Sequence, residues 1–365
     1  MNAIMLKIEG KSRFTRAQKL CLAAIAACLV LLLANIPLFA EYLFARGITR
    51  CISGFLSFIT NRIPVSLYEI VAVLLIMGAV ALVAFLIIQA IRRRFCCVKR
   101  TLFRLFAAAV GVLIAFGVLY APLYERDSVS AALGLPDAQV TQESVFEAAR
   151  YYVERLNAVS ARMERDEEGN AVSPLTFAET AQLLNAEFSA LDSDYFSPYT
   201  VWPKQVALSV PMSYLGITGI YFPFTAEANV NVNIPSYELP VTMAHEMSHA
   251  KGIARENEAN VAAYVLCIRS ENEFLQYSGL MNAAAVLLNA VSEEEYAQLR
   301  ETLAPEVLRE YANASAHYAK YDGFIDSLSS FFNDLFLKAN GVEEGTRSYG
   351  RTVQSLVALY EQLRG

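Results

Sequence analysis

The sequence predicts a mainly α-helical membrane protein, in which three N-terminal transmembrane helices precede an α-rich domain with a small β-hairpin or sheet. Two observations predict this class. The 365-residue chain is 55% hydrophobic, which is too apolar for one ordinary soluble domain. The excess is concentrated in apolar runs near the N-terminus, and the rest of the chain alternates between helical periodicity and one short β-rich stretch.

The three apolar runs predict transmembrane helices at about 18–40, 66–90 and 102–122. Each approaches the roughly 20 residues that span a hydrocarbon core of about 30 Å. The first run also resembles a signal peptide, because basic residues precede it and "LFA" resembles a weak cleavage site. Its length and the two later runs favour an uncleaved anchor.

Charge is distributed unevenly along the chain. Residues 1–121 contain 14 Lys and Arg against 3 acidic residues, whereas residues 122–365 contain 16 against 33. The basic residues cluster before the first run and between the second and third, and Lys and Arg are retained on the cytoplasmic side. We therefore expect an inside N-terminus and an outside C-terminal domain. Nucleic-acid binding is the alternative use of such clusters, but their position directly beside apolar runs argues against it.

The segment 42–63 has two helical stripes, one polar and one apolar. This pattern is typical of a helix that lies in the membrane interface. A fourth transmembrane helix is the alternative, and two arginines in the middle of the segment argue against it. The sequence thus divides into a membrane anchor, 1–122, and an outer domain, 123–365.

Helical periodicity in the outer domain begins at Thr141–Arg165 and continues in Pro174–Leu191, with Ser173 as the expected N-cap. The stretch 218–235 is rich in β-branched and aromatic residues and predicts the hairpin or sheet. Helices resume at Pro240, with breaks expected near Gly252, Gly279, Pro305 and Gly341. Five of the six cysteines lie in the membrane part, so the outer domain has no disulfide framework and Cys267 is expected in its core.

The stretch "HEMSH" places two of the chain's three histidines four residues apart. On a helix, His245 and His249 lie on one face and can bind one metal ion, and Glu246 can reach a water on that ion. Zinc is the expected metal, because neutral imidazole suits it and three protein ligands leave a fourth position open. The alternative is a histidine pair on a partly buried helix, hydrogen-bonded to its neighbours.

A third ligand must come from "GIARENEAN", which follows directly. Arg255 stays protonated and cannot bind zinc, so a carboxylate is required. Glu256 shares a helix face with two alanines small enough to pack beneath the histidine helix, whereas we expect Glu258 to point to solvent beside Arg255. Asn260, one turn after Glu256, is placed to orient a histidine through its second ring nitrogen.

The pattern HExxH followed by E-x-x-A-N resembles the glutamate zincins (gluzincins), a class of zinc metallopeptidases. The spans, "GIYFPFTAEANVN", "HEMSHAKGIARENEAN" and "LKANGVEEGTRSYGR" together resemble the bacterial membrane family labelled domain of unknown function 3810. The resemblance implies a zincin-like domain with Glu256 as the third ligand. It implies no substrate. The number of residues between the histidines and Glu256 is far smaller than in the membrane-embedded zincins, and this sets the chain apart from them.

Further functional residues are less sharply indicated. Tyr349 and Arg351 follow a glycine-marked turn and are candidate oxyanion donors, while His317 lies in a polar row and is expected at the surface. The strand "YFPFTAEANVN" is either core or a strand that pairs with an extended peptide.

We therefore expect a multi-pass protein of the bacterial cytoplasmic membrane whose outer domain is a zinc (Zn²⁺) metallohydrolase, most simply a peptidase with Glu246 as general base. The expected partners are membrane lipid and a peptide or cell-envelope substrate, and not nucleic acid. The alternatives are a non-catalytic, zinc-stabilised sensor or receptor and a cell-wall amidase.

Overall fold

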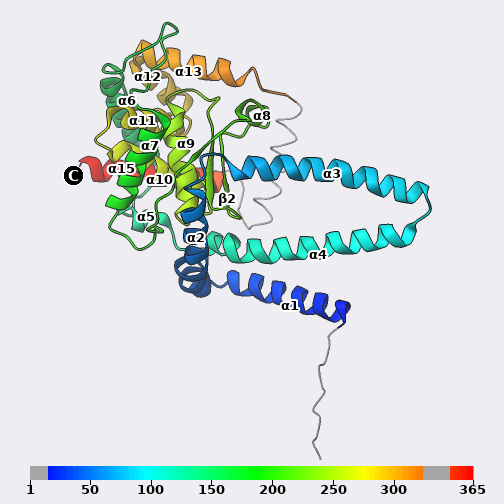
Figure 1. Ribbon diagram of the computed structural model, residues 1–365. Coiled ribbons are helices and arrows are strands. Elements are labelled where there is room, and N and C mark those ends of the chain that lie inside the picture. Colours follow the sequence, from blue (N-terminus) through cyan, green and yellow to red (C-terminus); the bar gives the residue numbers. More distant parts are fainter. Residues whose placement is uncertain (1–14, 324–345, 365) are drawn as a thin grey trace, which may run out of the picture.

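The computed structural model describes residues 15–323 and 346–364. It shows a helical domain from one side of which a long pair of antiparallel helices, α3 and α4, projects, with α1 running in the same direction (Figure 1). The predicted break near Gly341 and the side chain of Tyr349 lie outside the described residues.

Two helices are long and apolar enough to cross a membrane. The first is α3, Leu67–Ile91, which buries none of its side chains; the second is the continuous segment Phe95–Glu125, made of α4 (Phe95–Leu119) and the 3₁₀ helix η2 (Ala121–Glu125). Both are compatible with membrane anchoring. Their positions overlap the second and third predicted runs, although α4 begins seven residues before the predicted start at about 102.

The first predicted run is not one straight helix. Helix α1, Arg16–Ala34, ends before the predicted boundary, and the chain bends by 116° between Cys21–Ala34 and Phe39–Thr60. The bend coincides with Pro37, which cannot continue the backbone hydrogen bonding of a helix. A third transmembrane helix therefore stays a prediction.

The predicted interfacial segment is a π-helix, η1 (Phe39–Thr49), that continues into α2 (Arg50–Thr60). The polar stripe of α2 does not face water. Ser57 and the following Asn61 donate to the carbonyl of Thr200, and Arg50 donates to that of Asp194. The apolar stripe is left exposed on the other side, at Ile52, Phe55 and Ile59.

The domain after the α3–α4 pair begins with a short helix and two amphipathic helices. The short helix α5 is Val129–Ala132, and α6 is Gln142–Ser160, capped by Thr141. The amphipathic pattern predicted α6, but the helix ends five residues before the predicted end at Arg165. The start of the second amphipathic helix was predicted wrongly: α7 is Phe177–Ala190 and begins three residues later. The reason is that Thr176 and Glu179 form a reciprocal capping box, which Ser173 does not offer.

The β-rich stretch forms the predicted hairpin, and a third strand joins it. Strands β2 (Gly219–Phe222) and β3 (Glu227–Asn231) are antiparallel, and β1 (Lys204–Val206) pairs with β3 in parallel. The order β1-β3-β2 leaves β2 at one edge of the sheet. The short helix α8, Ser209–Ser213, lies between β1 and β2 in the chain.

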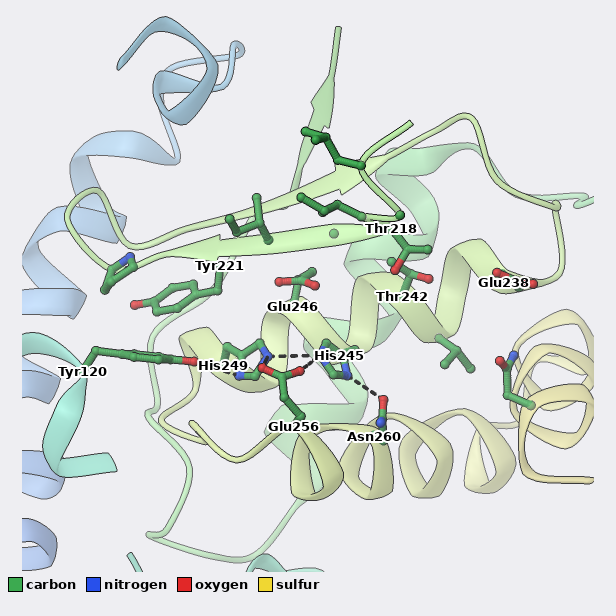
Figure 2. Close-up of a pocket in the computed structure, with 18 of the residues that line it drawn as sticks. Tyr120, Thr218, Tyr221, Glu238, Thr242, His245, Glu246, His249, Glu256 and Asn260 are labelled. Carbon is green, nitrogen blue, oxygen red and sulfur yellow. Dashed lines mark hydrogen bonds and ion pairs between the residues drawn. The ribbon is translucent and has the colours of Figure 1, made fainter. Parts of the chain in front are cut away.

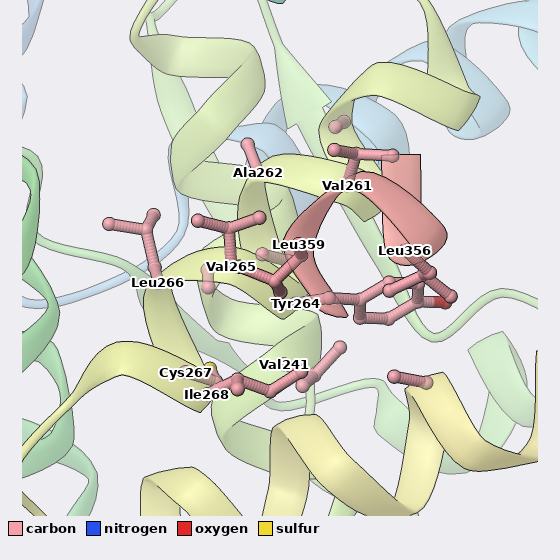
Figure 3. Close-up of a cluster of buried hydrophobic side chains, with 14 of the residues drawn as sticks. Val241, Val261, Ala262, Tyr264, Val265, Leu266, Cys267, Ile268, Leu356 and Leu359 are labelled. Carbon is pink, nitrogen blue, oxygen red and sulfur yellow. The ribbon is translucent and has the colours of Figure 1, made fainter. Parts of the chain in front are cut away.

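Helix α10 is the centre of the core. It packs against α9, α11 and α15, and its side chains from Val261 to Ile268 are buried with those of α15 (Figure 3). Cys267 is buried among them, as predicted. The helices of this part are α9 (Glu238–Ala250), α10 (Glu256–Arg269), α11 (Glu273–Leu288), α12 (Glu293–Thr302), α13 (Pro305–Tyr318) and α15 (Thr346–Arg364).

The break predicted at Gly279 is wrong, because this glycine lies inside α11. A Cβ there would lie 2.8 Å from a side-chain carbon of Ile268 and 2.9 Å from the Cβ of Cys267. The residue is needed for the close approach of two helices and not for a turn. Gly252 does end a helix, with a φ of +107°.

Candidate metal centre

Two consecutive helices bring the three predicted ligands together. His245 and His249 lie one turn apart on α9, and Glu256 is the first residue of α10. The turn between them is tight because Gly252 adopts a left-handed backbone conformation and Ile253 N–H bonds back to the carbonyl of Ser248. Figure 2 shows the two rings and the carboxylate facing one another.

The distances define a three-ligand cluster. Nε2 of His245 lies 3.0 Å from Nε2 of His249, and the carboxylate oxygens of Glu256 lie 3.1 Å from His245 and 3.5 Å from His249. Among the residues that the structure describes, these are the only three His, Cys, Asp or Glu side chains whose ligand atoms gather in this way. His249 is buried, while the side chain of Glu256 is 44% exposed.

The outer nitrogens of both rings are occupied. Nδ1 of His249 lies 2.7 Å from the carbonyl oxygen of Ile253, which can only accept, so this nitrogen carries the proton. Nδ1 of His245 donates to Oδ1 of Asn260 at 2.8 Å, the contact predicted from the spacing. Both Nε2 atoms therefore face inward, and each offers a lone pair when its ring is neutral.

Two lone pairs and a carboxylate only 3.0 to 3.5 Å from each other repel unless a positive charge lies between them. Burial lowers the pKa of His249, but the nearby Glu256 carboxylate outweighs burial and raises it to about 9. Burial opposes ionisation of Glu256, yet the two histidines hold its pKa well below the usual range. The donor set fits a cation that prefers nitrogen and carboxylate ligands, as zinc does.

Glu246 lies beside the cluster and does not join it. Its side chain is buried, and Oε2 has no hydrogen-bond partner among the described residues. Burial raises the pKa of Glu246 to about 7, against the opposing effect of the two histidines. A carboxylate of this kind can exchange a proton near neutral pH.

Strand β2 holds Glu246 in place. A Cβ on Gly219 would lie 2.5 Å from Oε1 of Glu246 and 2.6 Å from its Cγ. Only a glycine leaves room for the carboxylate at this point of the strand. The strand and α9 together border a cavity of about 600 Å³ that contains all three ligands and Glu246.

Two tyrosines from the end of the apolar segment Phe95–Glu125 also line this cavity, and the sequence did not indicate them. The hydroxyl of Tyr120 lies 3.3 Å from Nδ1 of His249. The hydroxyl of Tyr124 is buried and has no hydrogen-bond partner among the described residues. "LYAPLYE" reads as the end of a membrane helix, and nothing local connects it to histidines more than 120 residues later.

Other predicted residues lie elsewhere. Arg351 lines a separate hollow with Arg255 and Glu258, so the structure does not bring it to the histidines. His317 is half-buried and bonds to the carbonyl of Asn233 at 3.0 Å instead of standing free at the surface. The expectation that Glu258 faces solvent is wrong: its side chain is buried and pairs with Arg255 at 3.1 Å.

Arg126 joins the loop before Glu256 to the π-helix η1. This buried guanidinium donates to the carbonyl of Gly252 at 2.7 Å and to both carboxylate oxygens of Glu41 at 2.9 Å. It also stacks on the ring of Tyr195, 3.6 Å from the centroid. The connection between the histidine helix and the third ligand is therefore fixed by Arg126, which Glu41 of η1 holds in place.

Comparison with known proteins adds one finding. Neither the curated proteins nor the solved structures contain a match to this chain. A family model does match, and it covers residues 44–357, which include the α3–α4 pair and the whole metal centre. The chain belongs to the family described as "Protein of unknown function (DUF3810)".

Proposed function

We propose that this protein is a membrane-anchored zinc peptidase of the glutamate-zincin type, whose site lies outside the cytoplasmic membrane. The observation that carries the proposal is the convergence of His245, His249 and Glu256 beside a buried carboxylate, Glu246, that is not a ligand. A purely structural zinc site would need no such neighbour and would close its fourth position with a further ligand. No further His, Cys, Asp or Glu among the described residues joins the cluster.

The three ligands fit zinc by type and by the direction of their lone pairs. Zinc held in this way polarises a carbonyl and lowers the pKa of a bound water to about 7. Asn260 and the carbonyl of Ile253 fix the ring tautomers, so both Nε2 atoms stay free to bind the metal.

Glu246 supplies the proton transfers of peptide hydrolysis. As a carboxylate it takes the proton from the attacking water, and as the acid it passes that proton to the leaving amine. Its burial favours this exchange near neutral pH. The contact with Gly219 keeps the carboxylate from swinging away from the metal centre.

The other cavity walls suit an extended peptide. Strand β2 borders the cavity and is one of the two edge strands of the described sheet, so its backbone can pair with a substrate strand. The free hydroxyl of Tyr124 is suited to donate to the oxygen that becomes negatively charged. Tyr124 thus replaces Arg351 as the candidate donor.

Replacing Glu246 by Gln tests the proposal in the full chain, purified in detergent. We expect unchanged zinc content and a loss of about 10²–10⁴-fold in peptide hydrolysis, because only the general base is removed. Glu294→Gln, an exposed change on α12, is the control. If Glu246→Gln behaves as wild type in cells and the wild-type chain cleaves no peptide, the non-catalytic sensor is correct; cleavage of cell-wall amides instead of peptides identifies an amidase.

A further inference from the structure

We propose that the substrate is a polypeptide anchored in the same membrane and cut in the segment directly outside the bilayer. This inference rests on the proposed peptidase function and adds the substrate class. It follows from which segments of the chain line the cavity, and from three exposed apolar surfaces near the N-terminal end of α3, which we call its root.

One wall of the cavity is the end of a membrane helix. Phe116, Tyr120 and Tyr124 line it, and all three belong to the apolar segment Phe95–Glu125. The ring of Tyr120 contacts both Tyr221 of β2 and His249, with centroids 5.8 and 6.3 Å away. The metal centre is therefore in direct contact with Tyr120, the residue that directly follows α4.

A second wall, residues 215–221, begins just after α8. The segment before α8 is fixed at the root of α3, because the N–H groups of Ala207 and Leu208 donate to the carboxylate of Glu69 at 3.0 and 2.7 Å. Glu69 lies in the first turn of α3. Figure 1 shows α8 beside the first turns of that helix.

Apolar side chains are exposed around this root. On and next to α8, Leu208, Val210 and Tyr214 are each between 44% and 48% exposed. Trp202 is exposed beside the end of α2, where its backbone N–H donates to Oδ1 of Asn61 at 3.1 Å. The exposed stripe of α2 adds a third surface. Exposed apolar groups from separate segments, next to a helix that enters a membrane, fit lipid as their partner.

With these surfaces in lipid, the cavity opens at the level of the membrane interface. A polypeptide anchored in that membrane presents its emerging segment at this level and at a high effective concentration. A peptide dissolved in water has neither advantage. The edge of β2 then pairs with the substrate chain where that chain leaves the bilayer. The site therefore prefers membrane-anchored substrates to soluble peptides.

The membrane contact is tested without any activity measurement. Trp202 is the only tryptophan of the chain, so its fluorescence in lipid vesicles reports its own surroundings. Spin-labelled lipids should quench Trp202, and they should quench the single tryptophan of Trp202→Phe/Val210→Trp. The control is Trp202→Phe/Tyr296→Trp, since Tyr296 is 41% exposed but lies on α12, far from α3 in Figure 1. Lack of quenching at both 202 and 210 would overturn the inference.

The substrate class is tested with a randomised peptide segment, offered either free or joined to a membrane helix, at equal bulk concentration to the full chain in vesicles. We expect the anchored form to be cut at least about tenfold faster. Val210→Asp should lower only the rate on the anchored form, and Tyr296→Asp should change neither rate. Equal rates on both forms would overturn the substrate class and leave the peptidase standing; cleavage of neither form by the zinc-loaded protein would overturn the proposed function itself.

Discussion

Gly219 and Glu246 are in contact across the gap between β2 and α9, and the space between them is too small for a methyl group. The Cβ of an alanine at position 219 would lie within 2.8 Å of three atoms of the glutamate side chain. The sheet thus sets the position of the carboxylate as closely as the helix that bears it.

Gly219→Ala should displace Glu246 and lower hydrolysis by about 10²-fold, since a misplacement of about 1 Å has this effect on a catalytic group. Zinc content should stay unchanged, because no ligand is touched. Gly78→Ala is the matched control, as a Cβ there meets nothing within 4 Å. Full activity of Gly219→Ala would contradict the assignment of Glu246 as general base.

Glu256→Ala should weaken metal binding, whereas Glu258→Ala should weaken folding and leave metal binding intact. Loss of a ligand should weaken zinc affinity by more than about 100-fold, because loss of an outer partner already has an effect of about 10–100-fold. Glu258→Ala should leave zinc content intact but lower the free energy of unfolding by about 1–3 kcal/mol, since a buried partner of Arg255 is lost. Metal content and thermal unfolding of the full-length variants measure both. If Glu258→Ala loses zinc and Glu256→Ala keeps it, then Glu258 and not Glu256 is the third ligand.

The orientation in the membrane is predicted from charge alone. A reporter that is active only outside the cytoplasm should give signal when fused after residue 365, and a reporter active only inside should not. The reverse result would place the cavity in the cytoplasm and would indicate that the bent segment 21–60 does not cross as one span.

Lys204 should make stability depend on pH. Its ammonium is buried between α2 and β1 and donates to the carbonyls of Thr60 and Ile63 at 3.0 and 2.6 Å. Burial lowers the pKa of Lys204, against the effect of Glu227. The unfolded chain therefore binds more protons above this lowered pKa, so stability should rise with pH until the usual value of about 10.4 is reached. Thermal unfolding across this range should show the rise in the wild type and lose it in Lys204→Met; an unchanged slope would contradict the assignment.

The core of the site was predictable because its signals are local. His245, His249, Glu256 and Asn260 lie within 16 residues, and helix geometry alone decides which of them share a face. Tyr124 and Gly219 were not predictable, because they reach the site through long-range packing that no sequence period records. The exposure of Glu258 was predicted wrongly, because its burial depends on an ion pair with Arg255 that forms only in the folded domain.

The fold follows the same division. Apolar runs and capping residues indicated most helices, whereas the π-helix and the inward-facing polar stripe of α2 depend on what they pack against. Ser57 and Asn61 look like solvent-facing residues in the sequence. The domain supplies their hydrogen-bond partners instead, at the carbonyl of Thr200.

The bridge from Glu41 through Arg126 to Gly252 has a consequence for newly made chains. It joins a residue that precedes the α3–α4 pair to the loop that presents the third ligand, so both sides must be in place before the loop is held. In the folded chain Tyr120, which also follows the α3–α4 pair, reaches His249 in the same way. We therefore expect the proposed hydrolysis only after residues 39–49 have packed against the domain that contains the metal centre.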